Sequence, residues 1–292
     1  MVTTRVTWDS LSDDIRRDIE AHAGPLTSID PVSSGFNSEL AVVLHSAGEA
    51  TFVKGLRTDH PRVWTQKQEK AVNPYVQPVT AALRWAIDTD EWNLLAFEHA
   101  PGRHVDYSPG SPDLAKFVQS LRTLQELPCP DIELKLAEKR WASYTDSPAL
   151  FVGDHLLHTE WSPSNVLVSD TALFVDWAWA TRGAAWIDPA CWVVWLIASG
   201  HSPQGAEGWA AQIPSWHDAP TEALAAFAAA QAALWSRIAE VDPEPWIKNM
   251  AAAAQQWSER RRIGAEAKGH LDLQPLVPLR PPYGRQTPVR WP

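Results

Sequence analysis

The residues from His158 to Asn165 read His-Thr-Glu-Trp-Ser-Pro-Ser-Asn, and Asp176 follows eleven residues after Asn165. Short apolar runs lie before, between and after these polar groups, which predicts buried strands joined by polar loops. Two carboxylates and a carboxamide on such loops form a donor set that holds a divalent metal on phosphate oxygens and orients a hydroxyl beside them. The stretch therefore predicts phosphoryl-transfer chemistry, with Glu160, Asn165 and Asp176 as catalytic residues and the last two as metal ligands.

This spacing resembles the catalytic loop of protein kinases and, more closely, that of the aminoglycoside phosphotransferase family. In that family, His-x-Asp-x-x-x-x-Asn is followed by a short strand that ends in a metal-binding Asp. Glu160 stands where the family has its catalytic Asp. Lys54 ends a predicted strand as Phe-Val-Lys, and the resemblance implies that it binds the α- and β-phosphates. Glu69, fifteen residues later on a predicted helix, then takes the place of the lysine-pairing glutamate.

The resemblance covers roughly residues 28 to 200 and also implies where a nucleotide binds. The loop at 33–39, with Ser34 and Gly35, would fold over the phosphates, although it has a single glycine. The segment at 94–100 looks like the one that joins the two lobes, where backbone groups meet adenine. Its candidate contacts are Phe97, Glu98 and His99. The implied cofactors are ATP or GTP and Mg²⁺.

The fold expected from this resemblance is α+β, a bilobal protein-kinase-like fold with a small β-rich lobe and a larger, mainly helical lobe. We expect a nucleotide-binding lobe at 1–98 and a catalytic and substrate lobe at 99–274. Six prolines and three arginines, with no acid, follow at 275–292 and predict an extended proline-rich tail.

Local patterns support this division. Apolar residues four apart predict a helix over 9–23, and three short β-rich runs over 26–56 predict antiparallel strands. Further patterns predict a helix at 62–72, a strand pair around 83–87 and 92–97, and helices from Asp188 onwards. The last two helices are expected at 221–241 and from Pro245, where proline suits a first turn.

Composition narrows the class of protein. The 292 residues carry a net charge of −10, which repels nucleic acid and anionic lipid. The two cysteines, Cys129 and Cys191, are too few for a disulfide scaffold and favour a reducing cytoplasm. The amino end has no signal-peptide pattern, and the longest apolar run is about half of a membrane span. We therefore expect a cytoplasmic protein with no nucleic-acid or membrane partner.

The acceptor is expected to be a small molecule with a hydroxyl group, such as an antibiotic or a related metabolite. The net charge favours a cationic acceptor through long-range steering, although it describes no single pocket. Trp161, Trp177 and Trp179 surround the catalytic residues, so they would form an aromatic wall beside the acceptor or pack between loop and helices. The oligomeric state and the choice between ATP and GTP stay open.

Several single residues have a structural alternative. His158 is expected to orient the loop, and Asp188, in an Asp-Pro-Ala stretch, to cap a helix. Asp176 would pair with Arg182 if it bound no metal. Cys191, within an apolar run, is expected to be a core thiol.

Glu160 decides between two functions. Its extra methylene displaces the carboxylate by about 1 Å, a misplacement that can cost about a hundredfold in rate. Positioning and metal carry most phosphoryl-transfer catalysis, so we expect an active O-phosphotransferase, with a nucleotide-binding pseudokinase as the alternative. A metal hydrolase using His155, His158 and Glu160 lacks a second ligand cluster at zinc spacing, and a serine hydrolase lacks Gly-x-Ser-x-Gly.

Overall fold

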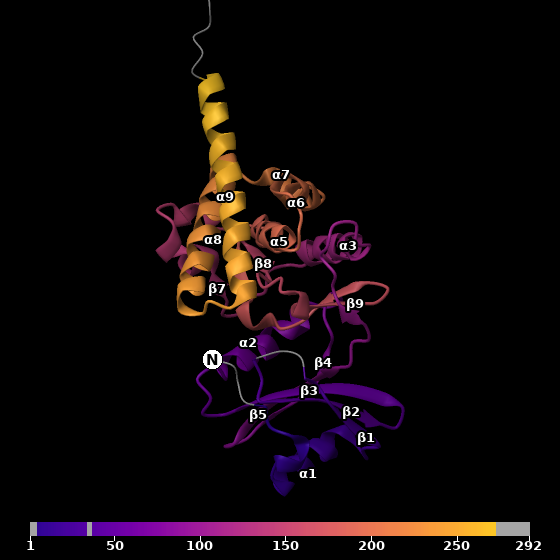
Figure 1. The fold of residues 1–292 in the computed structure, drawn as a ribbon. Helices are drawn as coiled ribbons and strands as arrows, with labels where there is room; N and C mark the ends of the chain where they lie inside the picture. Colours follow the sequence, from indigo (N-terminus) through magenta and orange to yellow (C-terminus); the bar gives the residue numbers. More distant parts are fainter. Residues whose placement is uncertain (1–4, 34–36, 273–292) are drawn as a thin grey trace, which may run out of the picture.

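The chain forms two lobes in the computed structural model, which describes residues 5–33 and 37–272 (Figure 1). The smaller lobe holds a five-stranded sheet in the order β1-β2-β3-β5-β4, with every neighbouring pair antiparallel. Its strands are β1 (Ser28–Pro31), β2 (Leu40–Ser46), β3 (Glu49–Arg57), β4 (Leu83–Asp88) and β5 (Trp92–Glu98). Two helices accompany the sheet, α1 (Asp13–Ala23) and α2 (Trp64–Val72), and α2 lies on the side of the larger lobe.

Local sequence explains how these elements begin and end. The Ser12 hydroxyl accepts the Ile15 N–H at the start of α1, and Gly24, with φ of 76°, ends this helix. Ala47 and Gly48 both have positive φ, which is the backbone of a tight two-residue hairpin between β2 and β3. This hairpin sets the register in which Lys54 of β3 pairs with Ala41 of β2, and on the other side Lys54 pairs with Leu95 of β5. Because β3 continues to Arg57, Lys54 lies within the strand and not, as had been expected, at its end.

The larger lobe is mainly helical and contains two small three-stranded sheets, β10-β9-β6 and β7-β11-β8. Its strands are β6 (Arg103–His104), β7 (Lys135–Leu136), β8 (His155–Leu157), β9 (Val166–Val168), β10 (Ala172–Phe174) and β11 (Thr181–Gly183). Its helices are α3 (Asp113–Glu126), α4 (Ala137–Arg140), α5 (Ile187–Ala198), α6 (Pro203–Ala210), α7 (Pro214–Asp218), α8 (Thr221–Val241) and α9 (Pro245–Asp272). Helices α8 and α9 run side by side along one flank (Figure 1).

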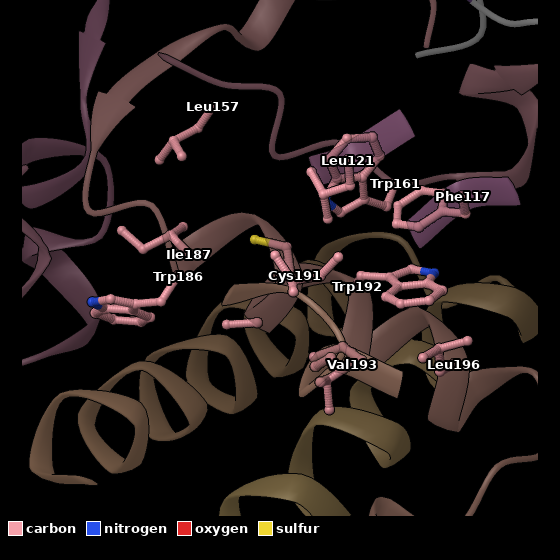
Figure 2. Close-up of a cluster of buried hydrophobic side chains, with 14 of the residues drawn as sticks. Phe117, Leu121, Leu157, Trp161, Trp186, Ile187, Cys191, Trp192, Val193 and Leu196 are labelled. Carbon is pink, nitrogen blue, oxygen red and sulfur yellow. The ribbon is translucent and has the colours of Figure 1, made fainter. Parts of the chain in front are cut away.

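Aromatic side chains fill the core of the larger lobe (Figure 2). Phe117 of α3 stacks on Trp192 of α5 with ring centroids 4.2 Å apart, and meets Trp161 edge to face at 4.9 Å. All three side chains are fully buried. The core therefore ties α3 and α5 to the loop that contains Glu160.

The expected α+β bilobal architecture is confirmed. The helix at 221–241 was predicted with its observed bounds, whereas α1 begins only at Asp13, because Ser12 caps it. The short helices α4, α6 and α7 were not predicted. The tail at 275–292 and the loop residues Ser34 and Gly35 lie outside the described residues, and the lobe boundary near residue 98 stays a prediction. Among the described residues, no helix is both long and apolar enough to span a membrane.

Replacement of Phe117 tests the aromatic core. Phe117→Ala removes a ring that touches both Trp161 and Trp192, so the free energy of unfolding should fall by about 3–5 kcal/mol, measured by urea denaturation. The matched control is Val241→Ala, because Val241 is 80% exposed; its effect should stay within about 0.5 kcal/mol. A loss below about 1 kcal/mol for Phe117→Ala would contradict this description of the core.

Candidate active site

Three charged side chains from the two lobes meet where the lobes face each other. The Lys54 ammonium of β3 lies 2.5 Å from Glu69 Oε2 of α2 and 3.4 Å from Asp176 Oδ1, which follows β10. The side chains of Lys54 and Glu69 are 12% and 5% exposed. The structure thus brings together the lysine, glutamate and aspartate that the sequence singled out, and neither Lys54 nor Glu69 is a solvated surface residue.

The charges in this group support one another. Burial lowers the pKa of Lys54, but the carboxylates of Asp176 and Glu69 outweigh burial, and its net pKa is raised. Burial raises the pKa of Asp176, yet the Lys54 ammonium and the hydrogen bond from Asn37, with a smaller effect of His158, together outweigh it, and the net pKa is lowered. Lys54 and Asp176 are therefore both ionised at neutral pH, as phosphate and metal binding require.

The segment around Asp176 is held by backbone bonds to the predicted catalytic loop. The Val175 N–H donates to the Asn165 carbonyl at 2.9 Å, and the His158 ring bonds the Val175 carbonyl through Nε2 at 3.0 Å. Asp176 has φ of 64°, a left-handed conformation that costs a non-glycine residue of order 1–3 kcal/mol. Such strain persists only where neighbouring contacts maintain it, and here it aims Asp176 at Lys54.

His158 lies entirely inside the protein. Its ring stacks on Trp161 with centroids 4.6 Å apart, and its Nδ1 accepts the Glu160 N–H at 3.2 Å. Burial lowers the pKa of His158 to about 4. The ring is therefore neutral, with the proton on Nε2, and it orients the loop without facing the cleft, as the sequence suggested.

Asp188 has a different role from the helix cap expected of it. Trp186, not Asp188, precedes the first turn of α5. The Asp188 carboxylate instead accepts the backbone N–H groups of His158 and Thr159, at 3.0 and 2.8 Å. Burial raises the pKa of Asp188 to about 7. This long-range contact fixes Thr159, which also has a left-handed φ, of 70°, directly before Glu160.

Glu160 itself is 40% exposed at the side chain, and burial raises the pKa of its carboxyl. Its Oε1 lies 3.4 Å from Nη2 of Arg140, at the end of α4. The same guanidinium donates through Nη1 to Thr159 Oγ1 at 2.6 Å and Thr181 Oγ1 at 2.8 Å. Arg140 therefore links the catalytic loop, the segment after Asp176 and the carboxylate of Glu160.

The donor set fits Mg²⁺. The Asn165 amide N–H donates to the Glu160 carbonyl at 3.1 Å, and its Oδ1 accepts the Ser164 hydroxyl at 3.4 Å and keeps a second lone pair for a metal. Asp176 supplies carboxylate oxygens. Among the side chains that the structure describes, those of residues 5–33 and 37–263, no three from His, Cys, Asp or Glu gather into a metal-binding cluster. A site with two protein ligands is typical of magnesium that is shared with substrate phosphates. Arg182 contacts Asp154, Cys129 and the Pro130 carbonyl instead of Asp176.

The segment between the lobes, at 94–100, offers few free groups to a nucleobase. Phe97 is buried at the end of β5, and the N–H groups of Glu98 and His99 donate to the carbonyls of Ala82 and Ala50. An adenine would thus need other groups of this segment. The contacts of Phe97, Glu98 and His99 with a nucleotide stay a prediction, as do those of Ser34 and Gly35.

The tryptophans near the site divide into two kinds. Trp161 and Trp177 are fully buried and pack around His158, so of the two alternatives, an acceptor wall or packing, the second holds for both. Trp179 is 39% exposed and lies between the cations of Lys135, at 4.7 Å, and Arg140, at 5.0 Å. Of the three, Trp179 alone is exposed to solvent. Cys191 is a core thiol, as expected.

Sequence reasoning missed two contacts of the site. Arg140 lies twenty residues before Glu160 on a four-residue helix, where no local pattern distinguishes it from a surface arginine. Asn37 contacts Asp176 Oδ2 at 3.5 Å and receives a hydrogen bond from Arg62 at 3.0 Å. Its place in the loop expected over the phosphates was the available signal.

A small cavity opens beside Glu160, between α4, the catalytic loop and helices α5 and α8. Its lining includes Arg140, Trp195, Gln231 and Trp235. The cavity volume of about 40 Å³ is room for roughly two or three water molecules. A larger groove, of about 770 Å³, lies elsewhere on the lobe beside Val152 and Trp186 and contains none of the predicted site residues.

No protein-family model matches the sequence, and no curated protein does. Among solved structures, choline kinase LicA from Streptococcus pneumoniae is similar over 85% of this chain and 99% of its own, with a TM-score of 0.60 and 14% identity. A thermostable mutant of aminoglycoside phosphotransferase APH(4)-Ia, in a ternary complex with ADP and hygromycin B, is similar over 86% and 99%, with a TM-score of 0.58 and 14% identity. At these identities the likeness establishes the fold. The chain has the bilobal fold of these small-molecule kinases, which confirms the fold that the resemblance implied.

The burial of His158 predicts a pH-dependent stability. Its pKa is about 4 in the folded protein, against 6.5 ordinarily, so only the unfolded chain takes up this proton between those values. The stability of the native protein relative to His158→Gln should therefore be complete above pH 6.5 and fall by roughly 3 kcal/mol as the pH drops to 4. Urea denaturation of both proteins at several pH values measures this difference, and a constant difference would contradict a neutral, buried His158.

Proposed function

We propose that this protein is a phosphotransferase that moves the γ-phosphate of ATP or GTP to a hydroxyl group of a small molecule. The observation that carries the proposal is the buried group of Lys54, Glu69 and Asp176, which joins both lobes within hydrogen-bond or ion-pair distance. Such a group holds a fixed ammonium and an ionised carboxylate at one point, which suits a polyphosphate and its metal. The solved structures of similar fold include a choline kinase and an aminoglycoside phosphotransferase, and some hold AMP, ADP or AMP-PNP, which supports the proposal.

In this proposal Lys54 binds the α- and β-phosphates, and Glu69 holds the ammonium in place. Asp176 and Asn165 bind Mg²⁺, which neutralises charge on the phosphates when it is bound. The acceptor oxygen forms a bond to the γ-phosphorus while the bond from that phosphorus to the bridging oxygen breaks. The products are ADP or GDP and a phosphate ester.

Glu160 accepts the proton of the acceptor hydroxyl during this step. Its backbone is fixed on both sides, by His158 Nδ1 at the N–H and by the Asn165 amide at the carbonyl. The pKa of the carboxyl is raised, because desolvation outweighs the nearby Arg140, and a raised pKa favours uptake of a proton. These bonds, together with the nearby Arg140, hold a longer side chain at the position of the family's aspartate.

Nucleotide binding is the first test. Mg²⁺ with ATP or GTP should raise the melting temperature, with a stabilisation of about 2.7 kcal/mol at a hundred times Kd. Asp176→Asn should abolish the magnesium-dependent part of the shift, because it removes a charged oxygen ligand. Asp154→Asn is the control, since Asp154 is 84% exposed, and it should behave as the native protein. A native protein that shows no shift with either nucleotide at millimolar concentration would contradict the proposal.

Transfer is the second test. Glu160→Gln keeps the side-chain length but cannot take up the proton, so kcat should fall by about 10²- to 10⁴-fold. Labelled phosphate from ATP or GTP is followed into a panel of aminoglycosides, nucleosides, sugars and neutral ring alcohols. The nucleotide-induced melting shift should stay unchanged, and the exposed Glu133→Gln serves as control.

Glu160→Asp separates the enzyme from the alternative pseudokinase. It restores the side-chain length of the family and should retain or raise the activity of the native protein. A native protein that transfers nothing while Glu160→Asp does is a lapsed kinase. Two inert proteins that bind nucleotide tightly would instead favour a scaffold or regulatory role.

A further inference from the structure

The cavity beside Glu160 shows which acceptors fit the proposed transfer site. It lies directly at the carboxylate that would accept the proton, and it is bounded by side chains from three helices. Its charge, its walls and its size each restrict the chemistry of the occupant.

The charges in the cavity cancel. Glu160 is the one acidic and Arg140 the one basic residue among the described residues that line it, and the two form an ion pair at 3.4 Å. Asp188 lies close by, but its carboxylate is occupied by the N–H groups of His158 and Thr159. A cationic acceptor would therefore meet a guanidinium beside the carboxylate, and no second carboxylate would compensate for the loss of its hydration.

Apart from the ion pair, the walls are mainly indoles, together with the amide of Gln231, the thiol of Cys191, the hydroxyl of Thr159 and the side chain of Leu234. Trp195 of α5 and Trp235 of α8 line the cavity and meet edge to face, with centroids 6.1 Å apart. Trp246 of α9 lies nearly parallel to Trp195 at 6.5 Å and is 55% exposed, so it extends this wall to the surface. Gln231 also lines the cavity, is 4% exposed, and approaches only the Cys191 thiol, at 3.9 Å, among its described hydrogen-bond partners.

The volume of the cavity limits which part of an acceptor can enter it. About 40 Å³ admits a hydroxyl or hydroxymethyl end but no ring. The rest of the molecule must lie outside, where the exposed indole of Trp246 adjoins Trp195 and Trp235 of the cavity wall. Planar and sugar rings pack well on such a face.

We propose that the acceptor is an uncharged, ring-bearing alcohol whose hydroxyl end enters this cavity and whose ring packs against Trp246. The proposal rests on the proposed function, because it assigns the substrate class of the same site. It differs from the cationic acceptor that the net charge of the whole protein favours. The amide of Gln231 supplies the hydrogen bond that orients the neutral polar end, and Arg140 excludes an ammonium group.

Paired probes, in which one member is neutral and the other carries an ammonium group on the same ring framework, test the proposal. One pair is phenyl β-glucoside and its 2-amino-2-deoxy counterpart, and the other is chloramphenicol and its deacylated amine. Binding is measured by calorimetry on the full chain with Mg²⁺ and AMP-PNP already bound. In each pair, the neutral member should bind the native protein at least about tenfold more tightly, because the amine meets Arg140.

Substitutions of Arg140 and Trp246 test whether these residues cause the preference for neutral probes. Arg140→Gln should invert the preference within each pair, because Glu160 is then left without its cation. Trp246→Ala should weaken the neutral probes about tenfold without loss of nucleotide binding, since its side chain is exposed. Trp85→Ala is the control, because Trp85 lies on β4 of the other lobe against His22, and it should change neither probe.

Three results would overturn the proposal. The amines could bind the native protein as tightly as the neutral probes do, or Trp246→Ala could bind the neutral probes with unchanged affinity. The third is that neither neutral probe binds at millimolar concentration. AMP-PNP is not hydrolysed, so these measurements do not depend on transfer. If Mg²⁺ and AMP-PNP themselves fail to bind in the first titration, the proposed function fails. If the nucleotide binds and the neutral probes do not, only the acceptor class is wrong.

Discussion

An ammonium group that is nearly removed from water needs carboxylates around it, and Lys54 is such a group. Its partners come from two places, Glu69 on the helix that covers the sheet and Asp176 on a loop of the larger lobe. Loss of either carboxylate would leave the buried charge undercompensated. The requirement therefore fixes where α2 and the loop after β10 lie relative to β3, and with them the two lobes.

Backbone hydrogen bonds connect the position of Asp176 to the loop that contains Glu160. Val175 is held by Asn165 on one side and by His158 on the other, and the amides of His158 and Thr159 end on Asp188 of α5. The strained φ angles of Thr159 and Asp176 lie within this network. The buried hydrogen bonds thus offset the cost of the left-handed conformations of Thr159 and Asp176.

Local sequence patterns were enough to predict much of the fold and several of the site residues. The helix at 221–241 and the strand that carries Lys54 follow from periodicity and turn residues. The spacing of Glu160, Asn165 and Asp176 resembles that of one family, and their expected roles followed from this resemblance. Contacts between distant segments were not accessible in the same way. Arg140 reaches Glu160 only through the fold, and the two N–H groups that draw Asp188 away from a capping role lie about thirty residues earlier in the chain.

Burial was equally hard to predict. Trp177 and Trp179 lie two residues apart, yet Trp177 is fully buried and Trp179 is exposed. The difference arises from which side of the loop faces α3 and α5, and no pattern of neighbouring residues contains that information. In the segment between the lobes, strand pairing already uses the N–H groups of Glu98 and His99.

A crystal structure with Mg²⁺ and AMP-PNP tests the central claim most directly. We expect Lys54 Nζ within hydrogen-bond distance of the α- or β-phosphate oxygens, and the metal bound by Asp176 and Asn165. The γ-phosphate should point towards Glu160. A triphosphate bound elsewhere, or a metal that Asp176 does not ligate, would contradict the assignment of this protein as a phosphotransferase.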